Sequence, residues 1–165
     1  MATVTATVRR DANTIISKGD AGTLRSMGAR TIELAASASG TIIDFKLRVS
    51  LNMRLDALSR LYHDDLATSG SPTIDIGAYP VDGNFTADDD CFNDGIAVSA
   101  VMTASTQTIG VPVIKDFANS GKKIWEFISG ATADTGGFAD IKGIVRDAAT
   151  NAVGTVTLDM KGYTD

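Results

Sequence analysis

The feature that most constrains the fold is a two-residue alternation that begins after Gly40. Over residues 41–52, apolar side chains hold the odd positions from Ile43, and polar side chains hold the even positions from Asp44. Successive side chains of a strand point to opposite faces of its sheet, so this pattern predicts a strand with one buried and one solvated face. The side chains expected to be buried are Ile43, Phe45, Leu47 and Val49, whereas Lys46 and Arg48 should face water or a partner.

Beyond Asn52 the alternation weakens, and a second interpretation competes with it. Met53, Leu55 and Ala57 continue the two-residue period. A helix is the alternative, because Leu51, Leu55, Leu58 and Tyr62 also share the spacing of one helical face. The strand interpretation is favoured, and a short helix over residues 51–62 stays open.

Further strand-like runs are separated by turns rich in Gly, Asp and Ser. The 25 Ile and Val residues far outnumber the nine Leu, and the 18 Asp far outnumber the two Glu, so residues that favour helices are scarce. The expected strands cover residues 73–79, 95–102, 108–115, 122–128, 138–146 and 154–161, with an acidic loop over residues 81–94. About eight strands at this spacing predict an all-β protein with a β-sandwich or jelly-roll-like body.

The first 30 residues lack the apolar period of the remainder. Residues 2–8 alternate Thr with Ala and Val, which permits one short strand, and residues 17–30 are rich in Gly, Ser and Arg without a period. We therefore predict an extended N-terminal arm over residues 1–30 and a single β-sandwich domain over residues 31–165. A merely flexible terminus is the alternative.

Charge and composition argue against several classes of partner. The 15 Lys and Arg against 20 Asp and Glu give a net charge of −5 without a basic block, so we expect no nucleic acid and no anionic membrane as partner. The single Cys91 forbids an internal disulfide, and the single His63 forbids a two-histidine metal motif. We see neither the apolar core of a signal peptide nor an apolar run long enough for a membrane helix.

The segment His63-Asp64-Asp65 places an imidazole beside two carboxylates, as a general base or a metal site would require. Adjacent side chains of a strand point to opposite faces, so these three cannot converge without a special turn. A histidine at a strand end, followed by turn-forming aspartates, is the favoured interpretation.

The acidic loop spaces oxygen ligands as calcium loops do. Asp82, Asn84 and Asp88 are the calcium candidates, but the loop lacks the central Gly of an EF-hand and has Asn93 where its bidentate Glu would lie. A solvated acidic loop is favoured, and we expect no metal and no cofactor.

Three aspartates precede Cys91 and should raise its thiol pKa, the opposite of what a nucleophile needs. Neither a nucleophile elbow nor a phosphate loop is present, so we predict that the protein is not an enzyme and takes no small-molecule substrate.

Residues 122–127 combine two lysines with two aromatic side chains, which raises the possibility of a sugar or nucleic-acid platform. The alternating spacing instead places Trp125 and Phe127 on one face of the expected strand. Packing in the core or at a subunit interface is the favoured role for Trp125.

Several segments together resemble a family of small virion proteins. Residues 59–77 (SRLYHDDLATSGSPTIDIG) place a strand and an Asp-Asp-Leu turn before Thr-x-Asp-x-Gly. The resemblance continues through residues 82–84 (DGN), 88–90 (DDD), 93–96 (NDGI), 121–126 (GKKIWE) and 154–158 (GTVTL). Over residues 40–160 the chain is similar to capsid decoration (cement) proteins of tailed bacteriophages, whereas residues 1–30 match nothing in that family.

The resemblance implies a structural protein that is made in the host cytoplasm and binds the outer surface of the phage head. Its partners would be the major capsid protein, whose subunits it bridges, and itself, as a homotrimer. The arm adds reach to such a protein, and its arginines could pair with acidic groups on the shell. The candidate contacts with the capsid or a neighbouring subunit are Thr3, Thr5, Arg9, Arg10 and Trp125. The alternative is a fibre-associated or carbohydrate-binding β-sandwich module of the virion, although one Trp and three Tyr make an aromatic patch hard to build.

Overall fold

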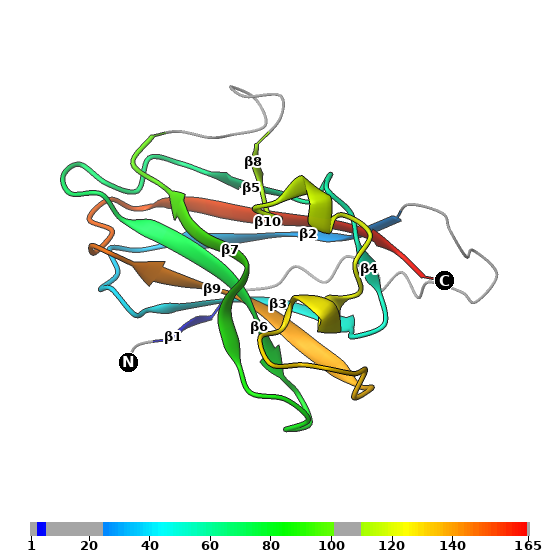
Figure 1. The fold of residues 1–165 in the computed structure, drawn as a ribbon. Helices are drawn as coiled ribbons and strands as arrows, with labels where there is room; N and C mark the ends of the chain where they lie inside the picture. Colours follow the sequence, from blue (N-terminus) through cyan, green and yellow to red (C-terminus); the bar gives the residue numbers. More distant parts are fainter. Residues whose placement is uncertain (1–2, 6–24, 101–109, 165) are drawn as a thin grey trace.

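The computed structural model describes residues 3–5, 25–100 and 110–164, which form two sheets packed face to face (Figure 1). The first sheet has the order β1 (Thr3–Thr5), β3 (Ile42–Ser50), β9 (Phe138–Arg146), β6 (Thr73–Pro80) and β7 (Asp88–Ala97). The second has the order β2 (Arg25–Leu34), β10 (Gly154–Tyr163), β5 (Arg60–His63) and β8 (Val111–Pro112), and β4 (Arg54–Leu55) also pairs with β10. The predicted all-β sandwich is confirmed.

The chain passes repeatedly between the two sheets. Strand β2 belongs to the second sheet, β3 to the first, β4 and β5 to the second, and β6 and β7 to the first. Among the described strands, every pair is antiparallel except β1 with β3, which is parallel. Each sheet is therefore assembled from segments far apart in the sequence.

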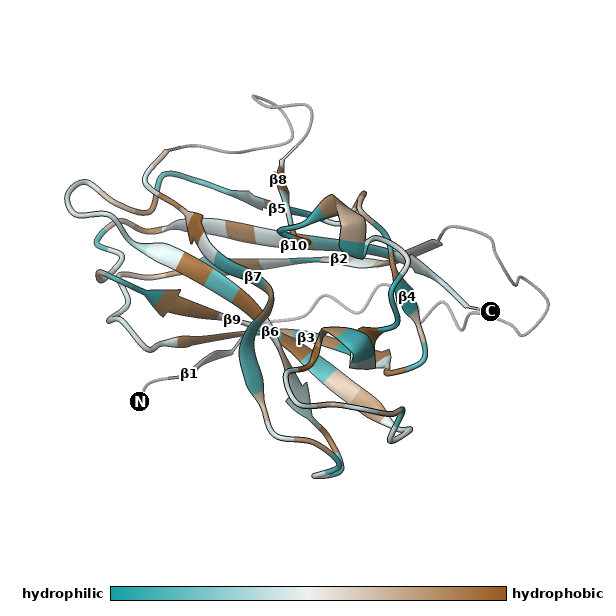
Figure 2. Cartoon of the chain, in the orientation of Figure 1, coloured by the Kyte–Doolittle hydropathy of each residue, from teal (hydrophilic) through white to brown (hydrophobic). Residues whose placement is uncertain are grey.

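The core lies between the sheets and follows the alternation seen in the sequence. Brown and pale residues alternate along the strands in Figure 2. The four side chains expected to be buried, Ile43, Phe45, Leu47 and Val49, are each at most 3% exposed. Lys46 and Arg48 are exposed. They form surface ion pairs with Asp44 and Asp140 respectively. The predicted faces of β3 are confirmed.

Strand β3 contains a bulge that the alternation does not reveal. Asp44 pairs with Lys142, and the next pair along β9 is Leu47 with Ile141, so two extra residues stand on β3. Lys46, one of the two, has a positive φ of 53°. Since two residues are inserted rather than one, the side chains beyond the bulge keep their faces, and Phe45 still enters the core.

The helix considered for residues 51–62 does not form. This stretch contains the short strands β4 and β5, joined by a turn in which Leu58 is exposed. Met53 and Leu55 are buried, as the two-residue period requires, whereas Leu58 would have shared the buried face of a helix.

The strand expected over residues 122–128 is wrong. Residues Ile124–Phe127 form a 3-10 helix, η2, so Trp125 and Phe127 do not share the face of a strand. The turn is stabilised locally, because the Glu126 carboxylate accepts a hydrogen bond from the backbone N–H of Lys123. Ile124 and Ile128 are the buried residues of this segment.

Two other strand boundaries also need correction. Strand β7 begins at Asp88 instead of residue 95, so the three aspartates predicted to lie in a loop belong to a strand. Pairing with β6 stabilises this segment, and the backbone passes so close that a Cβ on Gly77 would lie 2.0 Å from the carbonyl oxygen of Asp88. The strand predicted over residues 108–115 contracts to Val111–Pro112, and residues 101–109 lie outside the described residues.

The arm predicted over residues 1–30 is too long at its C-terminal end. Residues 25–30 begin β2, a full strand that pairs with β10 along its whole length, so the body starts by Arg25 instead of residue 31. The short strand allowed within residues 2–8 is present as β1. Residues 6–24 lie outside the described residues.

The buried and exposed sides of β3 allow a direct test of the core. Phe45→Ala should lower the free energy of unfolding by about 3–5 kcal/mol, because it leaves a cavity between the sheets. Lys46→Ala, which removes only an exposed ion pair, should change it by no more than about 0.5 kcal/mol. Urea unfolding followed by tryptophan fluorescence measures both, and equal losses would show that the side chain of Phe45 is not part of the core.

Candidate functional site

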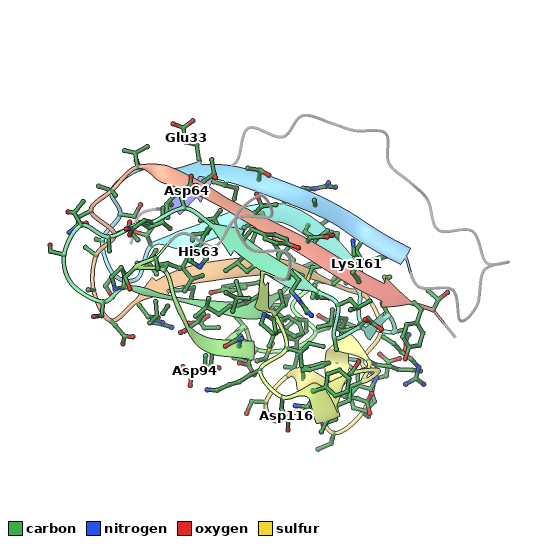
Figure 3. All side chains as sticks on the ribbon, turned by 90° about the horizontal axis from the view of Figure 1, so that it is seen from above. Glu33, His63, Asp64, Asp94, Asp116 and Lys161 are labelled. Atoms are coloured by element: carbon green, nitrogen blue, oxygen red, sulfur yellow. The ribbon has the colours of Figure 1, made fainter. Side chains whose placement is uncertain are left out.

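The most exposed large apolar side chain among the described residues is an aromatic one on a short turn. Phe117 is 80% exposed and begins the 3-10 helix η1 (Phe117–Asn119). The Asp116 carboxylate accepts a hydrogen bond from the Ala118 N–H, and the Ser120 N–H donates to the Phe117 carbonyl. The backbone under the exposed ring is therefore held in one conformation, and Asp116 lies at the periphery of the molecule (Figure 3).

A second exposed apolar side chain lies on the turn joined to η1. Leu58 is 53% exposed. The Ala57 N–H donates to the Ser120 hydroxyl at 3.1 Å, and the Gly121 N–H donates to the Leu55 carbonyl at 2.8 Å. These bonds link the turn that carries Leu58 to the turn that carries Phe117. We refer to the two side chains as the Leu58–Phe117 surface.

Charged groups of both signs border this surface. Lys115 pairs with Asp94 at 3.3 Å, and both side chains are largely exposed. The Arg60 guanidinium donates to the carbonyl oxygens of Ala57 and Ser59, which fixes it beside the Leu58 turn. Exposed apolar and charged side chains thus occur together on these two linked turns, a combination found in protein-binding patches.

The predicted contact Trp125 has a different environment. It is half-buried and packs against the hydrophobic core, and its backbone N–H donates to the Leu51 carbonyl. Its ring therefore covers part of the hydrophobic core. Contact of its exposed edge with a partner stays a prediction.

The predicted contacts in the arm are placed only in part. Thr3 and Thr5 belong to β1, in register with Ile42 and Asp44 of β3 at the edge of the first sheet. Arg9 and Arg10 lie outside the described residues.

Of the calcium candidates, the Asp82 and Asn84 side chains both approach Gly137, whereas Asp88 contacts another segment. The Asp88 carboxylate accepts a hydrogen bond from the Ser129 N–H at 2.6 Å, and the Asn84 amide donates to the Gly136 carbonyl. Asp82 is exposed. Among the described residues, no three His, Cys, Asp or Glu side chains are arranged to hold a metal ion.

The segment around His63 agrees with the structural interpretation. His63 ends β5 and is 2% exposed, with Nδ1 2.9 Å from the Asp64 carbonyl oxygen. The Asp64 side chain is engaged elsewhere, because it accepts hydrogen bonds from the N–H and hydroxyl of Thr155. The Nε2 atom is buried and finds no hydrogen-bond partner in the described part of the chain. Burial lowers the pKa of His63 from its ordinary value of 6.5, and the nearby Asp64 and Asp65 oppose this shift.

Cys91 is unsuited to nucleophilic chemistry. Burial is the main cause that raises the pKa of its thiol, and the carboxylates of Asp88 and Asp90 add to the shift. The direction is the one predicted from the sequence, although the aspartate charges are not the largest cause.

Charged side chains join three strands on the outer face of the first sheet. Arg146 on β9 contacts Asp75 on β6 at 3.1 Å and Asp89 on β7 at 2.8 Å. Asp75 is only 5% exposed, and it also accepts a hydrogen bond from the Gly95 N–H. The Tyr79 hydroxyl donates to Asp89 at 2.6 Å, and burial with this bond raises the pKa of Tyr79. Because each buried polar group has a partner, we interpret this network as structural.

An open depression of about 450 Å³ lies beside this network. Its lining includes Asp88, Asp89, Asp90, Ser129 and Arg146. Burial, followed by the neighbouring Asp88 carboxylate, raises the pKa of Asp90. The Arg146 guanidinium in the lining is paired with the Asp75 and Asp89 carboxylates, so the depression presents a mainly acidic surface.

The Leu58–Phe117 surface was not identified from the sequence. A signal for Phe117 was present, because a lone aromatic residue stands in the polar turn sequence DFANSG over residues 116–121. The exposure of Leu58 agrees with the two-residue period, which places Met53 and Leu55 on the buried face and Leu58 on the other.

Comparison with models of known protein families, with curated proteins and with solved structures gave no match for this chain. Within the described ranges, no helix combines the length and the apolar character that crossing a bilayer requires.

Burial of His63 makes stability depend on pH. The pKa of His63 in the folded protein lies below its unfolded value, so the unfolded chain takes up the proton first, and stability falls as pH drops below about 6.5. We expect His63→Leu to flatten the change in free energy of unfolding between pH 7 and pH 5. Denaturant titrations at each pH measure this, and parallel pH profiles for both proteins would contradict it.

Proposed function

We propose that this protein is a structural component of a bacteriophage virion that binds the outer surface of the head and stabilises the capsid by bridging major capsid protein subunits. The resemblance of residues 40–160 to capsid decoration proteins suggests this role. The structural observation that supports it best is Phe117, 80% exposed on a turn whose backbone is held by hydrogen bonds.

An exposed aromatic ring on a fixed backbone suits protein binding. A Phe in water exposes a large apolar area, and burying it in a partner yields free energy without the cost of first ordering the turn. Aromatic anchors of this kind contribute a large share of the binding energy in many interfaces. On the proposed head surface, Phe117 and Leu58 would form the apolar centre of the contact.

Contacts of modest strength suffice for this role if several act together. A homotrimer would present three Leu58–Phe117 surfaces and three N-terminal arms to neighbouring shell subunits. Once one subunit of the trimer is bound, the others bind at a high effective concentration, so the total affinity exceeds that of any single contact.

Titration of purified protein onto heads that lack it tests the proposal. Phe117→Ala should weaken binding at least about 10-fold, equivalent to about 1.4 kcal/mol. The matched control is Val153→Ala, which removes an exposed apolar side chain elsewhere and should leave affinity unchanged. Both variants should keep the free energy of unfolding within about 0.5 kcal/mol of the parent. No binding of the parent protein to heads would refute the proposal, and full affinity of Phe117→Ala would exclude this surface.

A further inference from the structure

We propose that β1 is exchanged between subunits, so that residues Thr3–Thr5 of one chain complete the first sheet of a second copy of the same chain. The site is the edge of β3 at Ile42, Ile43 and Asp44, where β1 pairs in parallel. The inference concerns assembly of the protein with itself and can be tested without heads.

The edge of β3 provides a slot of limited length. Pairing with β1 covers Ile42 to Asp44, and the bulge begins at the next residue, Phe45. A bulge disrupts the regular spacing of backbone donors and acceptors, so it limits how far an added strand can pair. Uncovered, this edge would expose unpaired N–H and C=O groups.

The outer face near the slot carries buried apolar surface in addition to the charged Asp44. Ile42 pairs directly with Ile144 of β9, so the two share the outer face of the sheet. Ile144 is only 3% exposed, although this face elsewhere carries charged side chains. An added strand here therefore extends a part of the sheet that is buried on its outer face as well as on its core face.

The chain that follows β1 is long enough to reach a neighbour. In its own subunit, β1 lies near the end of β2, whereas the chain re-enters the body at the start of β2, at the opposite end of the sandwich (Figure 1). Ten residues of strand separate these ends by roughly 30 Å at about 3.3 Å per residue. The 19 residues 6–24 can span roughly 60 Å when extended, about twice the distance that pairing within one subunit needs.

Exchange retains every contact that the folded-back strand makes. The same backbone hydrogen bonds form with the β3 of a neighbour, so the cost is small once subunits are close together. A three-residue strand is too short to pair stably alone, and a neighbour in a closed ring supplies a high effective concentration. The exchanged strand then connects subunits, which a strand folded onto its own β3 does not.

Disulfide trapping distinguishes pairing of β1 with the β3 of its own chain from pairing with the β3 of a second copy. In a Cys91→Ala background, Thr5→Cys is placed in a tagged chain and Asp44→Cys in an untagged chain, because these positions are register partners. Neighbouring strands place their Cα atoms within the range that a disulfide can span. After refolding together and mild oxidation, exchange predicts a disulfide-linked pair of one tagged and one untagged chain on a non-reducing gel.

The control replaces Asp44→Cys with Ser50→Cys, which lies beyond the bulge on the same strand and should give at most a tenth of the cross-linked product. A chain carrying both Thr5→Cys and Asp44→Cys should form linked multimers. If the mixture gives no cross-link, or links equally well through Ser50→Cys, the proposal is wrong. Cross-links confined to single chains of the double variant would also overturn it and would leave head binding as a separate question.

Discussion

The inward-facing side chains of β3 help to hold the two sheets together, and the hydrogen-bonding edge of the same strand holds β1. Phe45 is fully buried, and it belongs to the two-residue bulge that interrupts pairing with β9. The bulge therefore serves two purposes at one place in the chain: it keeps an aromatic ring in the core, and it limits the length of the open edge. The fold and the proposed assembly both depend on this strand.

The alternation of β3 could be predicted because burial imposes a period of two on any strand with one solvated face. The bulge could not, since two inserted residues leave that period unchanged. The same alternation was misleading at Trp125 and Phe127, where local hydrogen bonds stabilise a 3-10 turn. Strand β7 was missed at its acidic start because the pairing that stabilises it comes from β6, which a local pattern does not report. The order of strands in each sheet could not be predicted either, because consecutive strands often belong to different sheets and a local pattern does not show which strands pair.

In the candidate site, too, some features could be predicted from the sequence and others could not. The roles of His63 and Cys91 followed from local reasoning about strand geometry and charge, and their environments agree with it. The Leu58–Phe117 surface depends on hydrogen bonds between residues more than 60 positions apart, such as Ala57 with Ser120. The polar turn around Phe117 was a sequence signal of its exposure, but the link between its turn and the Leu58 turn is a property of the assembled fold.

The central claim is that this sandwich is a binding component of a virion head. Quantitative mass spectrometry of purified heads tests it most directly, by counting copies of this chain for each copy of the major shell protein. The account predicts a fixed ratio across preparations, which does not rise when excess purified protein is added to complete heads. A trace amount that varies between preparations, or recovery of the chain only in tail or fibre fractions, would contradict it.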